Sequence, residues 1–306
     1  MTSGPTREAM EIGAIRPAGR RSFSLRWSLR SMFLLMTALA LWLGWYCNRA
    51  QLQRRAVASI EEQGGRIIYS HQLPLIQLGT PGLKAEAPWL AQYLGIDYAD
   101  TVGIVEMIGD KFDDDDLKLL DSLPGVEMIR LHGTAITGRS FDSVSRHKRL
   151  HWLVVKDSPL EGGALQHLAR LPGLKTLYLE GTEVGDEDLW HLVSLSRLED
   201  LSLNETRVGD RGMSFISQLT SLKELHLERT RITDRGVVEL APLKRLQRIT
   251  LYGTNITDKS VSVLLSLPAV KDAPVGQTNI TSAGQRRLSV HLSGQPTVAQ
   301  GIGTKE

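Results

Sequence analysis

Two histidines at equivalent positions of a repeating pattern are the first residues in this sequence that could bind a metal. His167 and His191 are 24 residues apart. Equivalent positions on neighbouring strands lie about 5 Å apart, which suits two ligands of one ion. The same column continues with Phe215 and Glu239, and no third ligand is apparent. A solvated face of the repeats is therefore favoured over a zinc site.

A run of four aspartates, Asp113–Asp116, is the second candidate. It lacks the alternating ligand spacing and the central glycine of a calcium loop, so a helix cap matched to the helix dipole is favoured. The sequence shows no Ser/His/Asp set, no glycine-rich phosphate loop and no CxxC motif, and Cys47 is its single cysteine. We expect no catalytic residues, no metal site, no cofactor and no enzymatic activity.

The charge is distributed unevenly. Of the formal net charge of +2, residues 1–48 carry +4 and residues 49–63 carry +1, which leaves −3 for the remainder. The acidic remainder is a poor surface for nucleic acid, so no nucleic-acid partner is expected.

A period of 24 residues organises most of the chain. In one unit Leu177 and Leu179 alternate as in a strand, a turn with Thr182 and Val184 follows, and helix-like leucine spacing completes the unit. A fixed period of 20–50 residues indicates a solenoid. The eight units begin at Val105, Ile129, Leu153, Leu177, Leu201, Leu225, Ile249 and Ala273.

Two polar positions recur within this unit. Asp114, Asp186, Asp210, Asp234 and Asp258 stand just before the helix-like half, where we expect helix N-caps. A second position carries a hydroxyl that we expect to bond backbone groups of neighbouring turns. Its members are Thr134, Ser158, Thr182, Thr206, Thr230, Thr254 and Thr278.

Residues 31–48 contain no charged side chain. As a helix at about 1.5 Å per residue they span about 27 Å, close to the hydrocarbon core of a bilayer. A cleaved signal peptide or a lipoprotein signal would place small residues where Trp45 and Tyr46 stand, so a membrane anchor is favoured over those two and over a buried helix. Five arginines precede the span and three follow it within fifteen residues. This bias predicts a cytoplasmic N-terminus and an extracytoplasmic repeat domain in the cell envelope.

The expected organisation has six segments. They are a disordered cytoplasmic basic tail (1–30), a transmembrane helix (31–48), a juxtamembrane helix (49–63), an N-terminal cap (64–104), the solenoid (105–292) and a disordered tail (293–306).

The motifs Thr230–Asp234 and Thr254–Asp258, each reading T-x-I-T-D, resemble those of leucine-rich repeat proteins, in particular bacterial single-pass membrane-anchored ones. The resemblance covers residues 105–291. It implies an α/β fold, a leucine-rich repeat solenoid or horseshoe with a parallel concave sheet, here preceded by one transmembrane helix. It also implies protein–protein interaction without chemistry.

The outward residues of the concave face form the candidate binding site, because aromatic residues and arginine are typical of interface hot spots. We expect a protein or peptide partner there, while residues 31–48 contact the lipid bilayer. Binding of a glycan or cell-wall polymer is the alternative. A sheet face made soluble by pairs such as Glu106–Arg130 and Lys156–Glu180 also explains these residues. The candidates are Trp152, Lys156, Tyr178, Glu180, Asn204, His226, Glu228, Arg248 and Tyr252.

Overall fold

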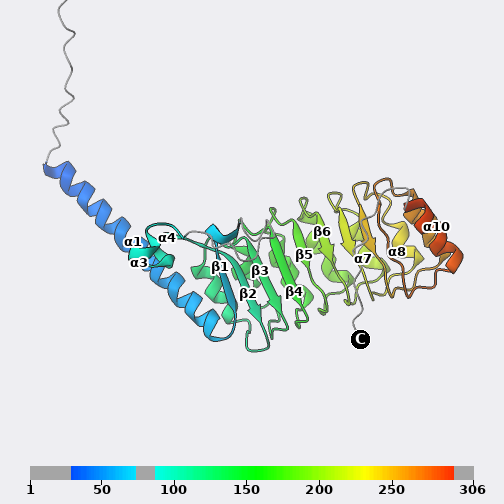
Figure 1. Cartoon of the computed structure of the whole chain (residues 1–306), viewed down its shortest axis with the longest axis horizontal. Coiled ribbons are helices and arrows are strands. Elements are labelled where there is room, and N and C mark those ends of the chain that lie inside the picture. Colours follow the sequence, from blue (N-terminus) through cyan, green and yellow to red (C-terminus); the bar gives the residue numbers. More distant parts are fainter. Residues whose placement is uncertain (1–28, 74–86, 293–306) are drawn as a thin grey trace, which may run out of the picture. The chain divides into compact units, whose positions relative to one another are not determined.

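The computed structural model describes residues 29–73 and 87–292. These residues fall into two units that divide between Trp45 and Tyr46, and each is described by itself. The predicted tails, residues 1–28 of the first and residues 293–306 of the second, lie outside the described residues. The second unit is built on an eight-stranded sheet with the strands in sequence order (Figure 1).

The first pair of strands is antiparallel and every later pair is parallel with a step of 24 residues. The parallel register follows the predicted period and confirms seven of the eight predicted strand positions. At the eighth, Ala273, the described residues form no strand, and Asp272 pairs with Arg248 only through an isolated bridge. The strands are β1 (Arg66–Tyr69), β2 (Val102–Ile108), β3 (Met128–His132), β4 (Trp152–Lys156), β5 (Thr176–Tyr178), β6 (Asp200–Ser202), β7 (Glu224–His226) and β8 (Arg248–Thr250).

Parallel strands need crossovers, and short helices supply them on one face of the sheet. The earlier crossovers are mostly 3-10 helices and the later ones are α-helices. The crossovers are η2 (Asp116–Ser122), α5 (Phe141–Ser145), η3 (Gly162–Ala164), α6 (Leu165–Leu168), η4 (Asp186–Ser194), α7 (Asp210–Ile216) and α8 (Asp234–Val238). Two more helices, α9 (Asp258–Ser266) and α10 (Ser282–Leu292), follow the last strand. The opposite face, which we predict to be concave, is called the sheet face below.

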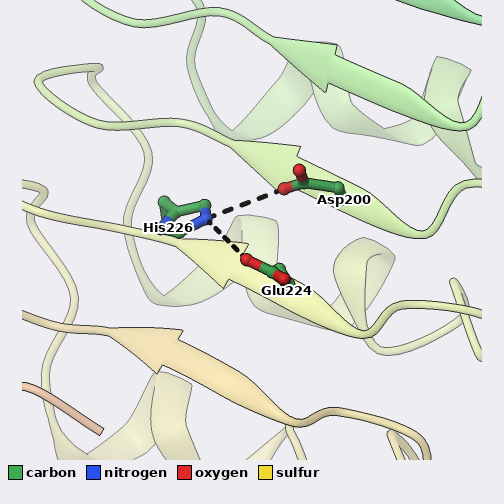
Figure 2. A group of neighbouring side chains, drawn as sticks. All are labelled: Asp200, Glu224 and His226. Atoms are coloured by element: carbon green, nitrogen blue, oxygen red, sulfur yellow. Dashed lines mark ion pairs between the residues drawn. The ribbon is translucent and has the colours of Figure 1, made fainter. Parts of the chain in front are cut away.

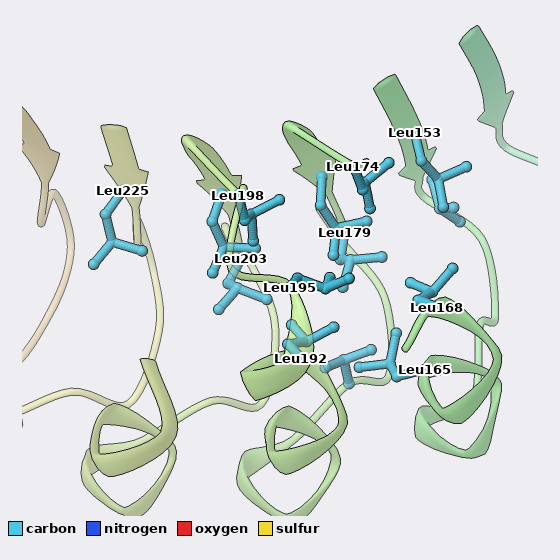
Figure 3. Close-up of a cluster of buried hydrophobic side chains, with 14 of the residues drawn as sticks. Leu153, Leu165, Leu168, Leu174, Leu179, Leu192, Leu195, Leu198, Leu203 and Leu225 are labelled. Carbon is cyan, nitrogen blue, oxygen red and sulfur yellow. The ribbon is translucent and has the colours of Figure 1, made fainter. Parts of the chain in front are cut away.

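The core lies between the strands and the crossovers. Leu179, Leu203 and Leu227 are completely buried at equivalent positions of three repeats. Figure 3 shows Leu179 and Leu203 beneath neighbouring strands, facing Leu192 and Leu195 of the crossover. The alternation of strand residues therefore places the leucines inward, as the sequence predicts.

The prediction that the repeated aspartates are N-caps is wrong. Asp234 is the first residue of α8, and the N-cap is Thr233. The Asp234 carboxylate instead reaches the next repeat, where it accepts bonds from the backbone N–H of Thr257 (2.8 Å), the Thr257 hydroxyl (2.6 Å) and the Ser260 hydroxyl (2.5 Å). These aspartates thus join successive repeats.

The same bond pattern recurs along the solenoid and forms what we call the aspartate ladder. Its carboxylates belong to Asp114, Asp186, Asp210, Asp234 and Asp258, and each accepts a backbone N–H from the following repeat. Gly138 and Gly162 interrupt the ladder, because glycine replaces aspartate at this position in two successive repeats.

The repeated threonines also bond differently from our expectation. The hydroxyls of Thr182, Thr206 and Thr230 donate to the carbonyl three residues earlier in their own repeat, at 2.6–2.7 Å. A bond between neighbouring repeats is present at Thr134, whose hydroxyl lies 2.9 Å from that of Ser158. Most of these residues therefore stabilise the turn after each strand.

One residue per repeat has a left-handed backbone directly after the strand. Gly133, Gly181 and Gly253 hold it with φ of 62–70°, whereas four other repeats hold it with φ of 48–57° at Asp157, Glu205, Arg229 and Gln277. Glycine adopts this conformation without a Cβ clash, and other residues do not.

We therefore expect Gln277→Gly to raise the free energy of unfolding by about 0.5–1 kcal/mol, since the relief of strain exceeds the added chain entropy. Gln277→Ala, which keeps a Cβ, gives no such gain. Chemical denaturation of the full chain measures both; an equal effect of the two substitutions would contradict the strain argument.

Helices cover both ends of the repeat core. The second half of α1 (Leu29–Glu62) buries Ala56, Val57 and Ile60 in it. Gln53, also buried, donates to the Asp100 carbonyl (3.0 Å) beside the short helices η1 (Ser70–Gln72), α3 (Ala91–Leu94) and α4 (Ile96–Ala99). At the other end α10 buries Leu288 and exposes its arginines. The cap at the first repeat therefore includes the segment that we expected to be only a juxtamembrane helix.

The first half of α1 has a different character. By length and hydropathy α1 is the one candidate membrane span among the described residues, and its most apolar window has mean hydropathy 1.3 and no buried residue. Phe33, Leu41 and Trp42 are among its exposed side chains. A signal sequence passes the same test.

Candidate binding surface on the sheet face

Two columns of side chains run across the sheet face. The strand register aligns Trp152, Thr176, Asp200, Glu224 and Arg248 in the first column. Successive members come from successive strands about 4.8 Å apart. A rigid row of outward side chains therefore crosses five repeats.

The second column lies two residues further along each strand. It contains Val154, Tyr178, Ser202, His226 and Thr250. Because side chains alternate along a strand, both columns point to the same side, away from the buried leucines between them.

A groove of about 850 Å³ lies along the first column. Its apolar lining includes Ile104, Met128 and Trp152 on β2, β3 and β4. Charged side chains of both signs line the rest. The full lining is Arg66, Ile68, Leu73, Ile104, Glu106, Glu127, Met128, Arg130, His151, Trp152, Lys175, Thr176, Glu199, Asp200, Lys223 and Glu224.

Trp152 lines this groove and is half-buried. Its indole Nε1 is shielded from solvent and has no hydrogen-bond partner among the described residues. An unmet buried donor is costly, so a site that supplies an acceptor to it gains stability. The indole thus offers an apolar surface to the groove, while its N–H donor is buried.

The charged side chains of the groove are partly paired. Lys223 donates to Glu199 at 2.5 Å, and this bond, together with the lysine charge, holds the pKa of Glu199 below its usual value. Arg130 donates to Glu106, which is a pair that the sequence predicts. The groove therefore presents alternating charges beside an apolar lining.

A histidine and two carboxylates meet at the far end of the groove (Figure 2). His226 Nε2 lies 3.7 Å from Oδ1 of Asp200 and 3.8 Å from Oε2 of Glu224. The potential ligand atoms of the three residues lie within 4.8 Å of one another. Among the described residues this is the one group of three or more His, Cys, Asp or Glu side chains that could hold a metal ion.

Tyr178 fixes the aspartate of this group. Its hydroxyl donates to Asp200 Oδ2 at 2.6 Å, and its ring meets the His226 ring edge-on with centroids 6.4 Å apart. Burial, together with the bond to Asp200, raises the pKa of Tyr178, so the phenol stays protonated and remains a donor. Burial raises the pKa of Asp200 as well, while the Tyr178 bond opposes that rise.

The nine residues predicted from sequence do not form one site. Trp152 lines the groove. His226 belongs to the histidine–carboxylate group, and Tyr178 and Arg248 lie beside that group. Glu180 pairs with Lys156 at 3.0 Å, the second pair that the sequence predicts. The others lie further along the sheet face, on the third outward column or beside it: Lys156, Glu180, Asn204, Glu228 and Tyr252.

Asn204 has a structural role that its sequence position does not reveal. Its side-chain oxygen accepts the backbone N–H of Glu228 at 2.8 Å. The side chain thus joins two repeats, and part of its outward surface is already used.

Sequence reasoning missed Asp200 and the charged row that contains Glu199 and Lys223. Asp200 has the same phase as Trp152 and Arg248, so the period alone was a usable signal. It was overlooked because an isolated acid at the start of a strand looks like an ordinary solvated residue.

The two histidines at equivalent repeat positions, His167 and His191, have different surroundings. His191 stacks on Trp190 with ring centroids 3.9 Å apart. The Nδ1 atom of His167 is buried without a hydrogen-bond partner among the described residues. Neither histidine belongs to the group of potential ligands found in the described part of the chain.

Comparison with known proteins supports the repeat fold. A family model described as a leucine-rich repeat matches residues 218–241. A search of curated proteins found no match.

Solved structures with a similar fold include two proteins of Listeria monocytogenes. One is an internalin (inlF), with 20% identity, a TM-score of 0.48 and coverage of 56% of this chain and 48% of that chain. The chain thus spans about half the length of this internalin. The other is internalin C2, with 19% identity, a TM-score of 0.49 and coverage of 72% of this chain and 90% of that chain.

The segment matched by the family model is one unit long, and the strand register repeats that unit through the sheet. The chain therefore contains leucine-rich repeats, and its described residues form a solenoid with an open, mainly parallel sheet.

Proposed function

We propose that this chain is a membrane-anchored interaction protein, and that its solenoid binds a protein or peptide in the groove of the sheet face. The observation that carries the proposal is the groove itself. It combines an apolar lining, a half-buried tryptophan and charges of both signs.

A peptide fits these features in physical terms. One apolar side chain can cover Met128 and Trp152. Charged side chains on either side can pair with the alternating row of Lys175, Glu199 and Lys223. Aromatic anchors in a desolvated pocket are the usual source of binding energy in such interfaces.

The anchor is proposed from the first half of α1. Its exposed apolar side chains are unfavourable in water and favourable in a bilayer, and the uncharged run is long enough to cross one. The excess of arginine before this run favours a cytoplasmic N-terminus, with the solenoid outside the cytoplasm.

We expect a periplasmic reporter fused after residue 292 to be active and a cytoplasmic reporter at the same position to be inactive. The reason is that the arginine bias keeps the N-terminus in the cytoplasm. Paired fusions of a periplasmic and a cytoplasmic reporter measure this in a bacterial host. Activity of the cytoplasmic reporter alone contradicts the topology, and release of a soluble solenoid contradicts the anchor.

Peptide selection tests the binding surface. We expect displayed peptides selected on the full-length chain in detergent to lose at least about tenfold in affinity on Trp152→Ala, as interface tryptophans often do. Trp190→Ala is the matched control, because Trp190 is exposed on the crossover η4.

Calorimetric titration of the selected peptides measures both variants. Loss of binding through Trp190 and not through Trp152 would move the interface to the crossover side. Selective binding of polysaccharide, with no peptide enriched, would favour the glycan alternative.

A further inference from the structure

We propose that Asp200, Glu224 and His226 form a binding site for a divalent transition-metal ion of the zinc class. The site stands on β6 and β7, at the end of the groove. It does not depend on the proposed function, because an ion can bind there whether or not a peptide does.

The three ligand atoms are close to the arrangement that zinc requires. His226 Nε2 lies 3.7 Å from Asp200 Oδ1 and 3.8 Å from Glu224 Oε2 (Figure 2). Two ligands of one tetrahedral zinc ion stand about 3.4 Å apart, because its bonds to nitrogen and oxygen are about 2.0–2.2 Å long. Shifts of a few tenths of an ångström bring His226 Nε2 to that distance from each carboxylate. The carboxylate oxygens of Asp200 and Glu224, which lie within 4.8 Å of each other, approach further when an ion binds.

Direct hydrogen bonds do not explain this convergence. Both separations exceed the range of about 2.7–3.2 Å for an N–H···O hydrogen bond. Asp200 Oδ1 is shielded from solvent and has no hydrogen-bond partner among the described residues. A buried carboxylate oxygen in this state is costly, and a cation at the centre of the group removes that cost.

Two neighbours orient the ligands as outer-shell groups do in zinc proteins. The Tyr178 hydroxyl donates to Asp200 Oδ2 at 2.6 Å, which leaves Oδ1 turned toward the histidine. His226 Nδ1 lies 3.3 Å from the Thr250 hydroxyl oxygen. With the proton on Nδ1, Nε2 presents its lone pair to the two carboxylates.

The surrounding charges favour a dication. Arg248 lies 4.0 Å from Glu224 Oε2 but is closer to Asp272, at 3.5 Å. Three carboxylates against one guanidinium leave this group with a charge of −2 when His226 is neutral. Tyr178 is uncharged, because its pKa is raised by burial and by Asp200.

The donor set selects the class of ion. Calcium and magnesium prefer oxygen ligands, whereas imidazole suits zinc and its neighbours among the transition metals. Three protein ligands leave a zinc ion one open position. Glu224 is the most exposed of the three, with 44% of its side chain accessible, so solvent reaches the site.

Zinc titration of the full-length chain in detergent tests the proposal. After removal of metals with a chelator, we expect calorimetry to show one saturable Zn²⁺ site per chain. Glu224→Gln and His226→Gln each weaken it at least about 100-fold, and Tyr178→Phe, which removes an outer-shell bond, weakens it about 10-fold. Zn²⁺ raises the Tm of the original chain and leaves the Tm of the two ligand variants unchanged.

His132→Gln is the matched control. His132 Nε2 pairs with Asp157 on the same sheet face at 3.1 Å, and within residues 29–73 and 87–292 no second carboxylate is paired with it. We expect no change in zinc affinity. The proposal fails if the original chain shows no saturable Zn²⁺ binding, or if the ligand variants bind Zn²⁺ as tightly as the His132 variant does. The zinc titration contains no peptide or protein partner. A negative zinc result therefore says nothing against peptide binding in the groove, and the reverse also holds.

Discussion

Leu203→Ala is expected to lower the free energy of unfolding by about 2–5 kcal/mol, the usual cost of a large-to-small change in a packed core. Leu203 is completely buried and stands between Leu179 and Leu227 in the stacked repeats. A solenoid gains its stability from such contacts between neighbouring units. The cavity therefore weakens two interfaces between repeats at once.

Asn204→Ala is the control for this substitution, because Asn204 is the next residue and faces outward. Its one bond, to the backbone N–H of Glu228, makes a loss of about 0.5–1.5 kcal/mol the expected effect. Guanidinium denaturation of the full chain, followed by circular dichroism, measures both. Equal losses would mean that the two faces of the strand are exchanged, since a slip of one residue exchanges them.

Asp234→Ala is expected to cost about 2–3 kcal/mol, because hydrogen bonds to a charged group contribute about 1.5–3 kcal/mol and this carboxylate is only partly buried. The substitution leaves the backbone N–H of Thr257 without its partner and frees the hydroxyls of Thr257 and Ser260. Asp115→Ala is the matched control. That carboxylate is exposed and pairs only with the exposed Lys118, so a change within about 0.5 kcal/mol is expected.

The contribution of Asp234 has a defined pH dependence. Burial raises its pKa, but the bonds from Ser260 and Thr257 outweigh burial and hold the pKa below the ordinary value of 3.8. A carboxyl with a lowered pKa in the folded state stabilises the fold above the unfolded pKa, and this stability is lost as the pH falls through the folded pKa.

The stability difference between the original chain and Asp234→Ala should therefore narrow below about pH 4. Denaturation curves at pH 7 and pH 3 measure it. A difference that widens in acid would show that the carboxylate is not the acceptor in this ladder.

The repeat and its register were predictable because they rest on hydrophobic periodicity. Leu177, Leu201 and Leu225 recur every 24 residues, and burial requires them to face the same way. The ion pairs of Lys156 with Glu180 and of Glu106 with Arg130 followed from the same register. Local pattern and global fold agree at these positions.

The aspartate ladder was not predictable from local pattern. An aspartate before a helix reads as an N-cap, and the sequence does not show that the crossover starts one residue earlier. The backbone N–H of Thr257 donates to Asp234, which is 23 residues earlier in the sequence, and this bond depends on how two turns stack. The same limit applies to Asp200, whose partners on neighbouring strands are set by side-chain rotamers.

Photo-cross-linking of the groove to a bound partner, in living cells that carry the full-length chain in their membrane, tests the groove most directly. A photo-reactive amino acid replaces Trp152 in the full-length chain, and the same amino acid replaces Trp190 on the crossover side in a second strain. A protein partner bound in the groove predicts a discrete cross-linked product from the Trp152 position and none from the Trp190 position. A product from the Trp190 position alone would contradict binding on the sheet face.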